Sequence, residues 1–587
     1  MEQLLAASPC TFSSIVVTNC STNLFSPWRR PGRARVVRRL TILSNLSSYL
    51  QPCRRRSANY HPSVWEPALI ESFTTPFSYE VHGPRLEDLK NQARNLLEHV
   101  QDPCSTLKLI DSLQRLGVSY HFGKEIAEAL DNVISTKTVV DDLYTTSLMF
   151  RILREHGYPI STDVFDKFRG GDSKFMQSLG SDAAGILNLY EASHLGMHRE
   201  DVMEEAKEFS AKHLKSFLGK LDCDLAMQVQ QSLQAPLRWR MPRTEAMNYI
   251  HAYQNHDTSH SALIELAKLD YNLVQAVYQQ ELRELASWWG ALGFKEKMSF
   301  SRDRLMENYI WAMGIVFEPQ LSKCRTNLTK FVCILTAIDD MYDVYGTLPE
   351  LELFTKAVNQ WGITAMKDLP EYMGACYLAL LDFVNDLELL ILKDHGSNTT
   401  GYIKDEWKKL CQSYLTEARW FYNGYTPDLD EYLENAWTSV GGPAAIVHAY
   451  TLQARLDGGK SESVDHSLKH GGELIYWSSL ITRLSNDLGT CKAESARGDT
   501  AKSTECYMAE AGASKEEAIE HVRRLLSRSW KKLNEESLKS SMPRSMMKMC
   551  LNMARTSHCL YQHGDGIGTS SGATKDLLMS LIVQTIN

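Results

Sequence analysis

Helical periodicity runs through nearly the whole chain and is the feature that most limits its fold. Between residues 269 and 289, apolar side chains recur every three or four positions, as on one face of an α-helix. Gly117, and Gly157 followed by Pro159, come after similar segments and predict helix ends. Alternating patterns typical of strands are scarce, and no repeat of fixed period occurs. The sequence therefore predicts an all-α protein.

The length of the chain favours two domains. A single ordinary core does not extend over 587 residues, and the polar, turn-like stretch 255–261 suggests a boundary. We predict an N-terminal helical domain over residues 55–265 and a C-terminal helical domain over residues 266–587. The thirteen cysteines include no C-x-x-C pair, which disfavours a zinc framework. No apolar run approaches the roughly 18–20 residues of a membrane span.

The first residues differ in charge from the rest. Residues 1–56 contain nine arginines, no lysine and one acidic residue, so this head carries a net charge of +8. Such a composition is typical of an organelle transit peptide, which we place at residues 1–54; a disordered basic arm is the alternative. The whole chain has a net charge of −8, so the remainder is strongly acidic. That charge argues against a nucleic-acid ligand.

Three aspartates interrupt an apolar helical stretch. Asp339 and Asp343 are four positions apart and Asp340 lies between them, so the three could share one side of a helix. Like charges repel there, and residues 331–349 contain no lysine or arginine to offset them. Oxygen ligands without Cys or His favour a hard cation, Mg²⁺ or Mn²⁺. A solvated helix end is the alternative interpretation.

A second oxygen-rich cluster strengthens the metal interpretation. Asn486, Thr490 and Glu494 recur every four residues, which places them in a slanted stripe along a helix, and Arg483 precedes them by about one turn. Taken alone, this pattern is common on surface helices. Together, the two clusters predict two metal-binding surfaces that hold a phosphorylated ligand between them, because Mg²⁺ usually completes its shell with water and phosphate oxygens.

Arginines are available to orient that phosphate. Arg302, Arg304 and Arg483 carry forked guanidinium groups that suit phosphate oxygens, although a surface charge pair is the alternative for the first two. A phosphate-loop-like segment around Gly459 lacks its first glycine and a preceding strand. The phosphate is therefore expected on a small substrate.

Four ordered motifs make the chain resemble the plant terpene synthases, specifically the plastidial monoterpene synthase group. The resemblance runs from about residue 55 to the C-terminus. It is carried by two arginines with a tryptophan nine positions later, by an Arg-Asp-Arg segment and by the two metal motifs: Arg55, Arg56, Trp65, Arg302, Arg304, Asp339, Asp340, Asp343, Asn486, Thr490 and Glu494.

The resemblance implies a fold and a reaction. An N-terminal α-barrel-like domain would precede a C-terminal class I terpenoid synthase α-bundle, as a monomer in the plastid stroma with no nucleic-acid or membrane partner. Three Mg²⁺ ions, or Mn²⁺ as a substitute, would bind the diphosphate of geranyl diphosphate through the two metal motifs. The C–O bond would then ionise to a carbocation, which gives a monoterpene olefin or alcohol and diphosphate.

The resemblance also implies roles for individual residues. The diphosphate would be contacted by Arg302, Asp339, Asp343, Arg483 and Asn486, with Arg304 helping to hold the leaving group away from the cation. The segment that carries Arg55, Arg56 and Trp65 would fold over the site. Aromatic faces that stabilise the carbocation are expected from Trp311, Tyr561 and Tyr345, although ordinary core packing is the alternative for each.

Three pocket positions bear on the product. Relatives that form isoprene carry phenylalanine at the positions of Val332 and Thr482, so this pocket should not be shortened to five carbons. Ile567 stands where some relatives carry a histidine, so the departing pyrophosphate or Tyr561 would take the final proton. These residues favour an acyclic or simple cyclic olefin and leave the product open.

Alternative functions remain at this point. A sesquiterpene synthase acting on farnesyl diphosphate shares these motifs. A chain-elongating prenyltransferase uses two D-D-x-x-D motifs, of which this chain has one. A helical scaffold that has lost the chemistry is the non-enzymatic alternative, and the intact motifs argue against it.

Overall fold

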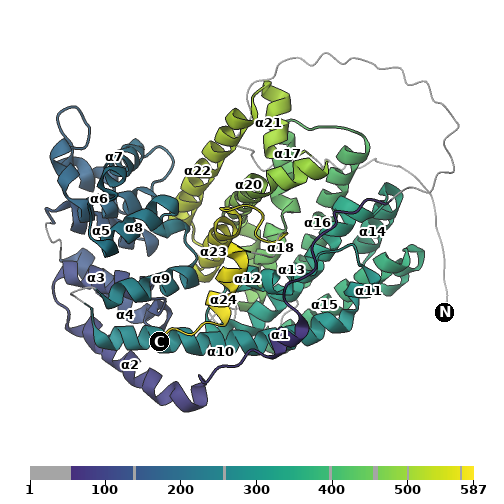
Figure 1. The fold of residues 1–587 in the computed structure, drawn as a ribbon, viewed down its shortest axis with the longest axis horizontal. Helices are drawn as coiled ribbons and strands as arrows, with labels where there is room; N and C mark the ends of the chain where they lie inside the picture. Colours follow the sequence, from purple (N-terminus) through teal and green to yellow (C-terminus); the bar gives the residue numbers. More distant parts are fainter. Residues whose placement is uncertain are drawn as a thin grey trace, which may run out of the picture. The chain divides into compact units, whose positions relative to one another are not determined.

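The computed structural model describes residues 55–587 except 137–139, 256–258, 396–399, 454–460, 499–500 and 569–571. The described residues form helices and no β-strand, apart from an isolated bridge between Arg169 and Phe175 (Figure 1). The predicted all-α fold is confirmed. The predicted transit peptide and the segment around Gly459 lie outside the described residues.

The helices up to the predicted domain boundary are mostly short. They are α1 (Pro67–Glu71), α2 (Tyr79–His99), α3 (Pro103–Arg115), η1 (Ser119–His121), α4 (Gly123–Ser135), α5 (Leu143–Glu155), η2 (Thr162–Phe168), η3 (Gln177–Ser181), α6 (Ala183–Ser193), α7 (Asp201–Phe217), α8 (Cys223–Gln234), η4 (Leu237–Trp239) and α9 (Pro242–Gln254).

The remaining helices include several long ones. They are α10 (Ser261–Leu292), α11 (Phe294–Lys297), α12 (Leu305–Ile315), η5 (Pro319–Leu321), α13 (Ser322–Asp340), η6 (Met341–Tyr345), α14 (Leu348–Gln360), η7 (Ile363–Asp368), α15 (Glu371–His395), α16 (Thr400–Tyr422), α17 (Leu429–Ser439), α18 (Gly442–Gln453), α19 (Ser461–His470), α20 (Gly472–Arg497), α21 (Ser503–Ala511), α22 (Lys515–Lys539), α23 (Arg544–Tyr561) and α24 (Ala573–Ile582).

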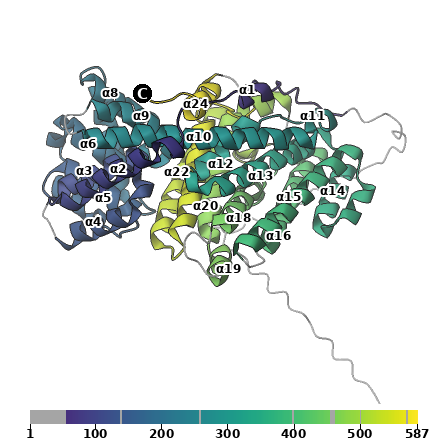
Figure 2. The ribbon, with the colours of Figure 1, turned by 90° about the horizontal axis from the view of Figure 1, so that it is seen from below.

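Helix α10 connects the two halves of the fold. It is 32 residues long and runs without a break through residue 265 (Figures 1 and 2). Its first part, from Leu263 to Leu273, packs into a core shared with α2, α3, α4, α5 and α9. Its second part, from Val274 to Ala286, packs into a core shared with α12 and α24. The change of core therefore lies inside the helix near Val274, about two turns beyond the predicted boundary, and the division into two domains stays a prediction.

A ring of five helices forms the C-terminal bundle. Helix α12 packs on α13 and α23, α13 packs on α18, and α18 and α23 both pack on α20. Helix α12 has almost no solvent-exposed face, because all but one of its eleven residues are buried. In the described part of the chain, no helix is both long and apolar enough to cross a membrane.

Candidate active site

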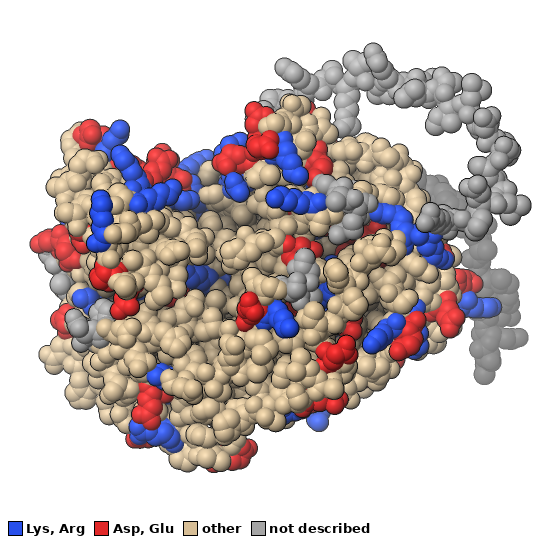
Figure 3. Space-filling view, viewed as in Figure 1, with Lys and Arg blue, Asp and Glu red and all other residues tan. Residues whose placement is uncertain are grey.

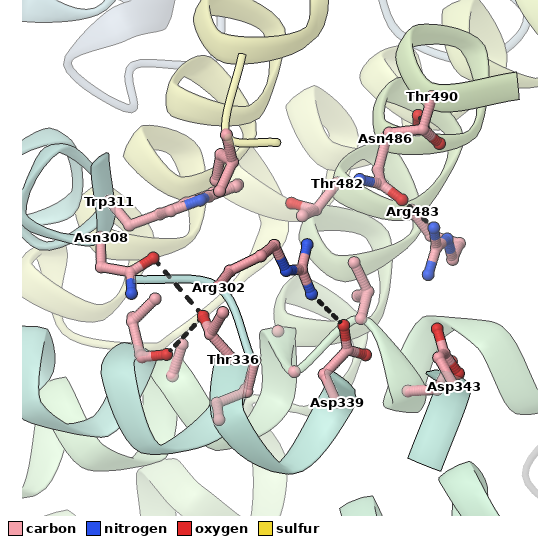
Figure 4. Close-up of a pocket in the computed structure, with 18 of the residues that line it drawn as sticks. Arg302, Asn308, Trp311, Thr336, Asp339, Asp343, Thr482, Arg483, Asn486 and Thr490 are labelled. Atoms are coloured by element: carbon pink, nitrogen blue, oxygen red, sulfur yellow. Dashed lines mark hydrogen bonds and ion pairs between the residues drawn. The ribbon is translucent and has the colours of Figure 1, made fainter. Parts of the chain in front are cut away.

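One cavity in the C-terminal bundle collects most of the predicted site residues. Its walls come from α12, α13, α18, α20 and α23 and from residues that follow them (Figure 4). The predicted residues that line it are Arg302, Trp311, Val332, Asp339, Asp343, Thr482, Arg483, Asn486, Thr490, Glu494, Tyr561 and Ile567. The cavity is therefore polar along the two motifs and apolar or aromatic over much of the remaining wall.

The first metal motif lies at the C-terminal end of α13. Asp339 and Asp343 line the cavity, whereas Asp340 has no exposed surface and is absent from the lining. Asp343 lies about one turn after Asp339, in η6, a short π-helical segment that continues α13, whereas Asp340 is rotated by about 100° from Asp339 and lies on another side. The prediction that all three share one side is wrong for Asp340. Its role as a metal ligand stays a prediction that this placement disfavours.

Asp340 instead holds Arg302. Its Oδ2 accepts hydrogen bonds from the backbone N of Arg302 at 2.7 Å and from Oγ of Ser301 at 3.1 Å. Its Oδ1 lies 2.8 Å from Nε of Arg302, which in turn reaches Asp339 at 2.6 Å through Nη2. Burial alone would lower the pKa of Arg302, but the two carboxylates raise it well above its ordinary value. Arg302 therefore stays charged and fixed at the cavity wall.

The second metal motif lies on α20 and faces the same cavity. Arg483 forms an ion pair of 2.7 Å with the buried Asp487 and donates a hydrogen bond to Oδ1 of Asn486. Asp487 also accepts hydrogen bonds from the hydroxyl of Tyr432 at 3.1 and 3.2 Å. Asp487 thus fixes Arg483 by a buried ion pair, as Asp340 fixes Arg302 on the other wall.

Apolar and aromatic residues complete the cavity. The rings of Trp311 and Tyr561 lie 6.2 Å apart on neighbouring helices α12 and α23, and both line the cavity. Tyr345 does not line the cavity. Its ring stacks on that of Phe300, with the ring centroids 3.9 Å apart, so Tyr345 is not placed for the predicted contact with a carbocation. Two of the three expected aromatic faces are therefore placed where a carbocation could contact them.

Two segments of the sequence match a known protein family. Residues 64–233 match the description "Terpene synthase, N-terminal domain", and residues 291–532 match "Terpene synthase family, metal binding domain". The chain belongs to the terpene synthase family. The resemblance stated from the motifs is confirmed.

Named relatives and solved structures agree with this membership. A trans-ocimene synthase from Litsea cubeba, described as chloroplastic, is 54% identical, and the match covers 91% of each chain. A limonene synthase with 2-fluorolinalyl diphosphate has a TM-score of 0.86 at 38% identity and covers 91% of this chain and 100% of its own. An isoprene synthase from grey poplar leaves, with three Mg²⁺ ions and dimethylallyl-S-thiolodiphosphate, has a TM-score of 0.81 at 39% identity and covers 89% and 99%.

The site of this terpene synthase fits Mg²⁺ by the chemistry of its donors. The first motif offers carboxylate oxygens and the second offers amide, hydroxyl and carboxylate oxygens, which are the ligands that hard divalent cations prefer. Among the described residues, no three His, Cys, Asp or Glu side chains gather closely enough to hold an ion by themselves. Water and phosphate oxygens would therefore complete each metal shell.

The N-terminal segment lies against the first metal motif. Arg55 forms a bidentate ion pair with Glu350, from Nη2 to Oε1 at 2.7 Å and from Nη1 to Oε2 at 2.8 Å. Arg56 donates to the backbone carbonyl of Asp343 at 2.9 Å, and its guanidinium lies over the ring of Phe421. The placement of both arginines agrees with a segment that folds over the site, and their catalytic role stays a prediction.

The other two residues of these motifs anchor backbone segments. Trp65 is 3% exposed and donates from Nε1 to Glu307 at 3.1 Å. Arg304 is fully buried and donates to four carbonyl groups, those of His61, Asp303, Ile567 and Gly568, at 2.8 to 3.0 Å. Neither residue lines the cavity. Arg304 instead ties the N-terminal segment and the segment after α23 to the same point, and the catalytic roles of Arg304 and Trp65 stay predictions.

Sequence reasoning missed several residues of the cavity wall. Lys502 lines the cavity beside Glu494 and lies 3.8 Å from Glu417, which lines it as well. Burial alone would lower the pKa of Lys502, but these two carboxylates raise it, so the lysine is a further cation facing the metal motifs. Helical spacing could not reveal Lys502, since it follows the end of α20. Asp487 could have been found, because it lies four residues after Arg483 on one helix.

Proposed function

We propose that this terpene synthase is a monoterpene synthase that ionises geranyl diphosphate. The observation that carries the proposal is the placement of Asp339 and Asp343 opposite Asn486, Thr490 and Glu494 across one cavity with an aromatic wall. A diphosphate bound between the motifs would present its hydrocarbon chain to that wall. The named relatives that make ocimene and limonene support a ten-carbon substrate.

Different residues of the site serve the metal ions and the leaving group. Three Mg²⁺ ions, with Mn²⁺ as a substitute, would be held by Asp339, Asp343 and the α20 motif, and when bound they stabilise negative charge on the leaving diphosphate. Arg302 and Arg483 stand fixed by buried carboxylates and add hydrogen bonds to the same leaving group.

The apolar wall protects the cation once the C–O bond has broken. Trp311 and Tyr561 offer ring faces, each worth about 0.5–2 kcal/mol to a nearby cation. The tandem-arginine segment limits the entry of water by covering the site, so the cation loses a proton before water can add. We assign that final proton to the departing pyrophosphate, which is the strongest acceptor next to the cation. The expected product is an olefin.

Localisation and assembly follow as part of the same proposal. The arginine-rich residues 1–54 would direct the chain to the plastid stroma, where the enzyme would act as a monomer without a membrane or nucleic-acid partner. Fusion of residues 1–54 to a fluorescent protein tests this directly. A signal confined to the cytosol would contradict it.

The substrate is tested by three parallel incubations of the purified protein with Mg²⁺. One contains geranyl diphosphate, one contains farnesyl diphosphate, and one contains geranyl and isopentenyl diphosphates. We expect a volatile ten-carbon hydrocarbon from geranyl diphosphate, detected by gas chromatography with mass spectrometry. Farnesyl diphosphate should turn over at a lower kcat/KM. A higher kcat/KM for farnesyl diphosphate would establish a sesquiterpene synthase instead, and a longer diphosphate formed from geranyl and isopentenyl diphosphates would indicate chain elongation.

A further inference from the structure

Two arginines outside the catalytic cavity lie next to each other without a carboxylate partner. Arg238 in η4 is 5% exposed, and its Nε donates to Oδ1 of Asn534 in α22 at 3.0 Å. Arg555 in α23 donates from Nε to the backbone carbonyl of Arg238 at 2.9 Å and from Nη1 to Asn552 at 3.2 Å. Within the described parts of the chain, neither guanidinium has a carboxylate at ion-pair distance.

The neighbouring arginines of the same segment show that this is unusual. Arg240 forms an ion pair with Glu245 at 2.6 Å, and Arg243 lies 3.8 Å from Asp270. Both are as buried as Arg238 or nearly so, and each has a carboxylate to offset its charge. Only Arg238, of these three, has no carboxylate at ion-pair distance among the described residues, and its backbone carbonyl contacts another arginine, Arg555. The absence of a partner is therefore specific to one position and is not a property of the segment.

Burial and mutual repulsion act together on the pair. Burial, together with the nearby charge of Arg238, lowers the pKa of Arg555 to about 9. Burial lowers the pKa of Arg238 to about 10. Both groups remain charged at neutral pH. The acidic group that acts on both is Glu155 at the end of α5, which itself lies 3.8 Å from Arg151. Arg238 is buried and Arg555 is half-buried, and two like charges with reduced access to water destabilise the fold unless an anion offsets them.

Unused donors beside the pair point to the same conclusion. The indole Nε1 atoms of Trp239 and Trp530 are buried and have no acceptor among the described residues. Their rings stack at 5.3 Å; Trp239 follows Arg238 in η4, and Trp530 lies one turn before Asn534 in α22. An indole N–H can only donate. Buried donors without partners in a native fold call for a water or an ion.

The pair is separate from the catalytic cavity. Met553 and Tyr561 of α23 line that cavity, while Arg555 is rotated by about 200° from Met553 around the same helix. Arg555 is partly exposed, so solutes can reach it from outside that cavity. Figure 3 shows that some lysine and arginine atoms (blue) lie within this face of the molecule as well as at its edge.

We propose that Arg238 and Arg555 form a second anion-binding site that takes a phosphate-class oxyanion, either inorganic phosphate or pyrophosphate. A doubly charged oxyanion offsets both guanidinium charges and accepts from their forked N–H groups. The bound anion links η4 of the N-terminal helices to α22 and α23 of the bundle. The proposal stands independently of the terpene substrate.

The test is a thermal unfolding titration of the full-length protein in metal-free buffer with EDTA. Sodium phosphate or pyrophosphate is added against sodium chloride at equal ionic strength, and the midpoint Tm is recorded. A ligand that binds only the folded state raises Tm as its concentration rises. We expect this rise in the unmodified protein and its loss in Arg555→Gln. A lower half-saturating concentration for pyrophosphate identifies the reaction product as the ligand, and the reverse order identifies free phosphate.

Matched variants separate this site from others. Arg524→Gln removes an exposed arginine of α22 that lies outside both sites, so it should keep the rise. Arg555→Lys keeps the charge but loses the fork, so it should raise the half-saturating concentration about tenfold, and it serves as the second variant if Arg555→Gln does not fold. The proposal is overturned if Tm of the unmodified protein does not respond, or if Arg555→Gln responds equally.

Discussion

Asp339 and Asp340 are adjacent in the sequence and have opposite surroundings. Asp339 faces the cavity, while Asp340 is enclosed and bonded to the backbone and guanidinium of Arg302. Burial raises the pKa of the Asp340 carboxyl, and the charge of Arg302 opposes that rise. The two aspartates should therefore differ sharply when each is replaced by asparagine.

Asp339→Asn removes a cavity-facing carboxylate from the metal motif. We expect kcat/KM to fall by about 100-fold and the Mg²⁺ concentration for half-maximal rate to rise, because the charge that attracts the ion is reduced. Asp340→Asn should lower the free energy of unfolding by about 2 kcal/mol through its weakened bonds to Arg302, and leave the Mg²⁺ requirement nearly unchanged. Steady-state kinetics against Mg²⁺ and urea unfolding measure both. An equal Mg²⁺ shift in the two variants would contradict the different roles.

Val332 and Thr482 are expected to set the length of the cavity. Both line it, and neither carries a bulky side chain. The double variant Val332→Phe, Thr482→Phe should lower kcat/KM for geranyl diphosphate more than tenfold, because two rings occupy space needed by the longer chain. The kcat/KM for the five-carbon dimethylallyl diphosphate should fall less than that for geranyl diphosphate, or rise. Val332→Leu with Thr482→Val is the control of smaller volume, and a uniform loss with both substrates would show general damage rather than shortening.

The N-terminal segment is the element whose docking depends most on charge. Burial alone would raise the pKa of Glu350, but hydrogen bonds from Arg55 and Thr347 lower it to about 2. A carboxyl whose folded pKa is below its ordinary value contributes stability above about pH 4.5 and loses it as pH falls toward 2. The protection factors of the amides in residues 55–66, which are corrected for the pH dependence of intrinsic exchange, should therefore be constant from pH 8 to pH 5 and fall below about pH 4.

Glu350→Gln supplies the comparison for this element. It removes the charge that Arg55 pairs with, so the segment should exchange faster at neutral pH already and lose the acid-dependent change. Glu352→Gln, which affects the exposed pair with Arg419, should behave like the unmodified protein. Unchanged exchange in Glu350→Gln would show that the segment is held by other contacts.

The element scale also shows what the sequence could predict. Helix ends at Gly117 and Gly157 were predicted, and both residues have positive φ. The two metal motifs were found because their residues recur at helical spacing. Three features escaped: the buried side of Asp340, the role of Lys502 beyond the end of α20, and the passage of α10 through the predicted boundary. Each depends on the packing between helices, whereas spacing describes one helix at a time.

At the scale of the whole molecule, buried histidines make stability depend on acid. His448 in α18 is buried, and His156 directly after α5 and His558 in α23 are half-buried. The three are spread over both halves, and burial lowers the pKa of each to about 4. The unfolded chain binds protons below about pH 6.5, so folded stability is full above that value and is lost as pH falls. Each histidine contributes a slope of up to about 1.4 kcal/mol per pH unit between pH 6.5 and 4.

Urea unfolding at pH 7.5 and pH 5 measures this slope. The midpoint should fall markedly at the lower pH, and His448→Leu should show a shallower fall because one of the protons is no longer taken up. His521→Leu, on the outer part of α22, should retain most of the dependence. A midpoint that is independent of pH over this range would contradict the buried neutral state of these rings.

The unbroken α10 has a practical consequence for swapping halves between related enzymes. A chimera joined at the polar stretch 255–261 would bring the donor's whole α10 with it, and residues 263–273 would then meet a foreign hydrophobic core. A crossover placed between Leu273 and Val274 keeps each stretch with the side chains that evolved beside it. Recombination of this fold is therefore best tolerated in the middle of a helix, where a designer would ordinarily avoid cutting.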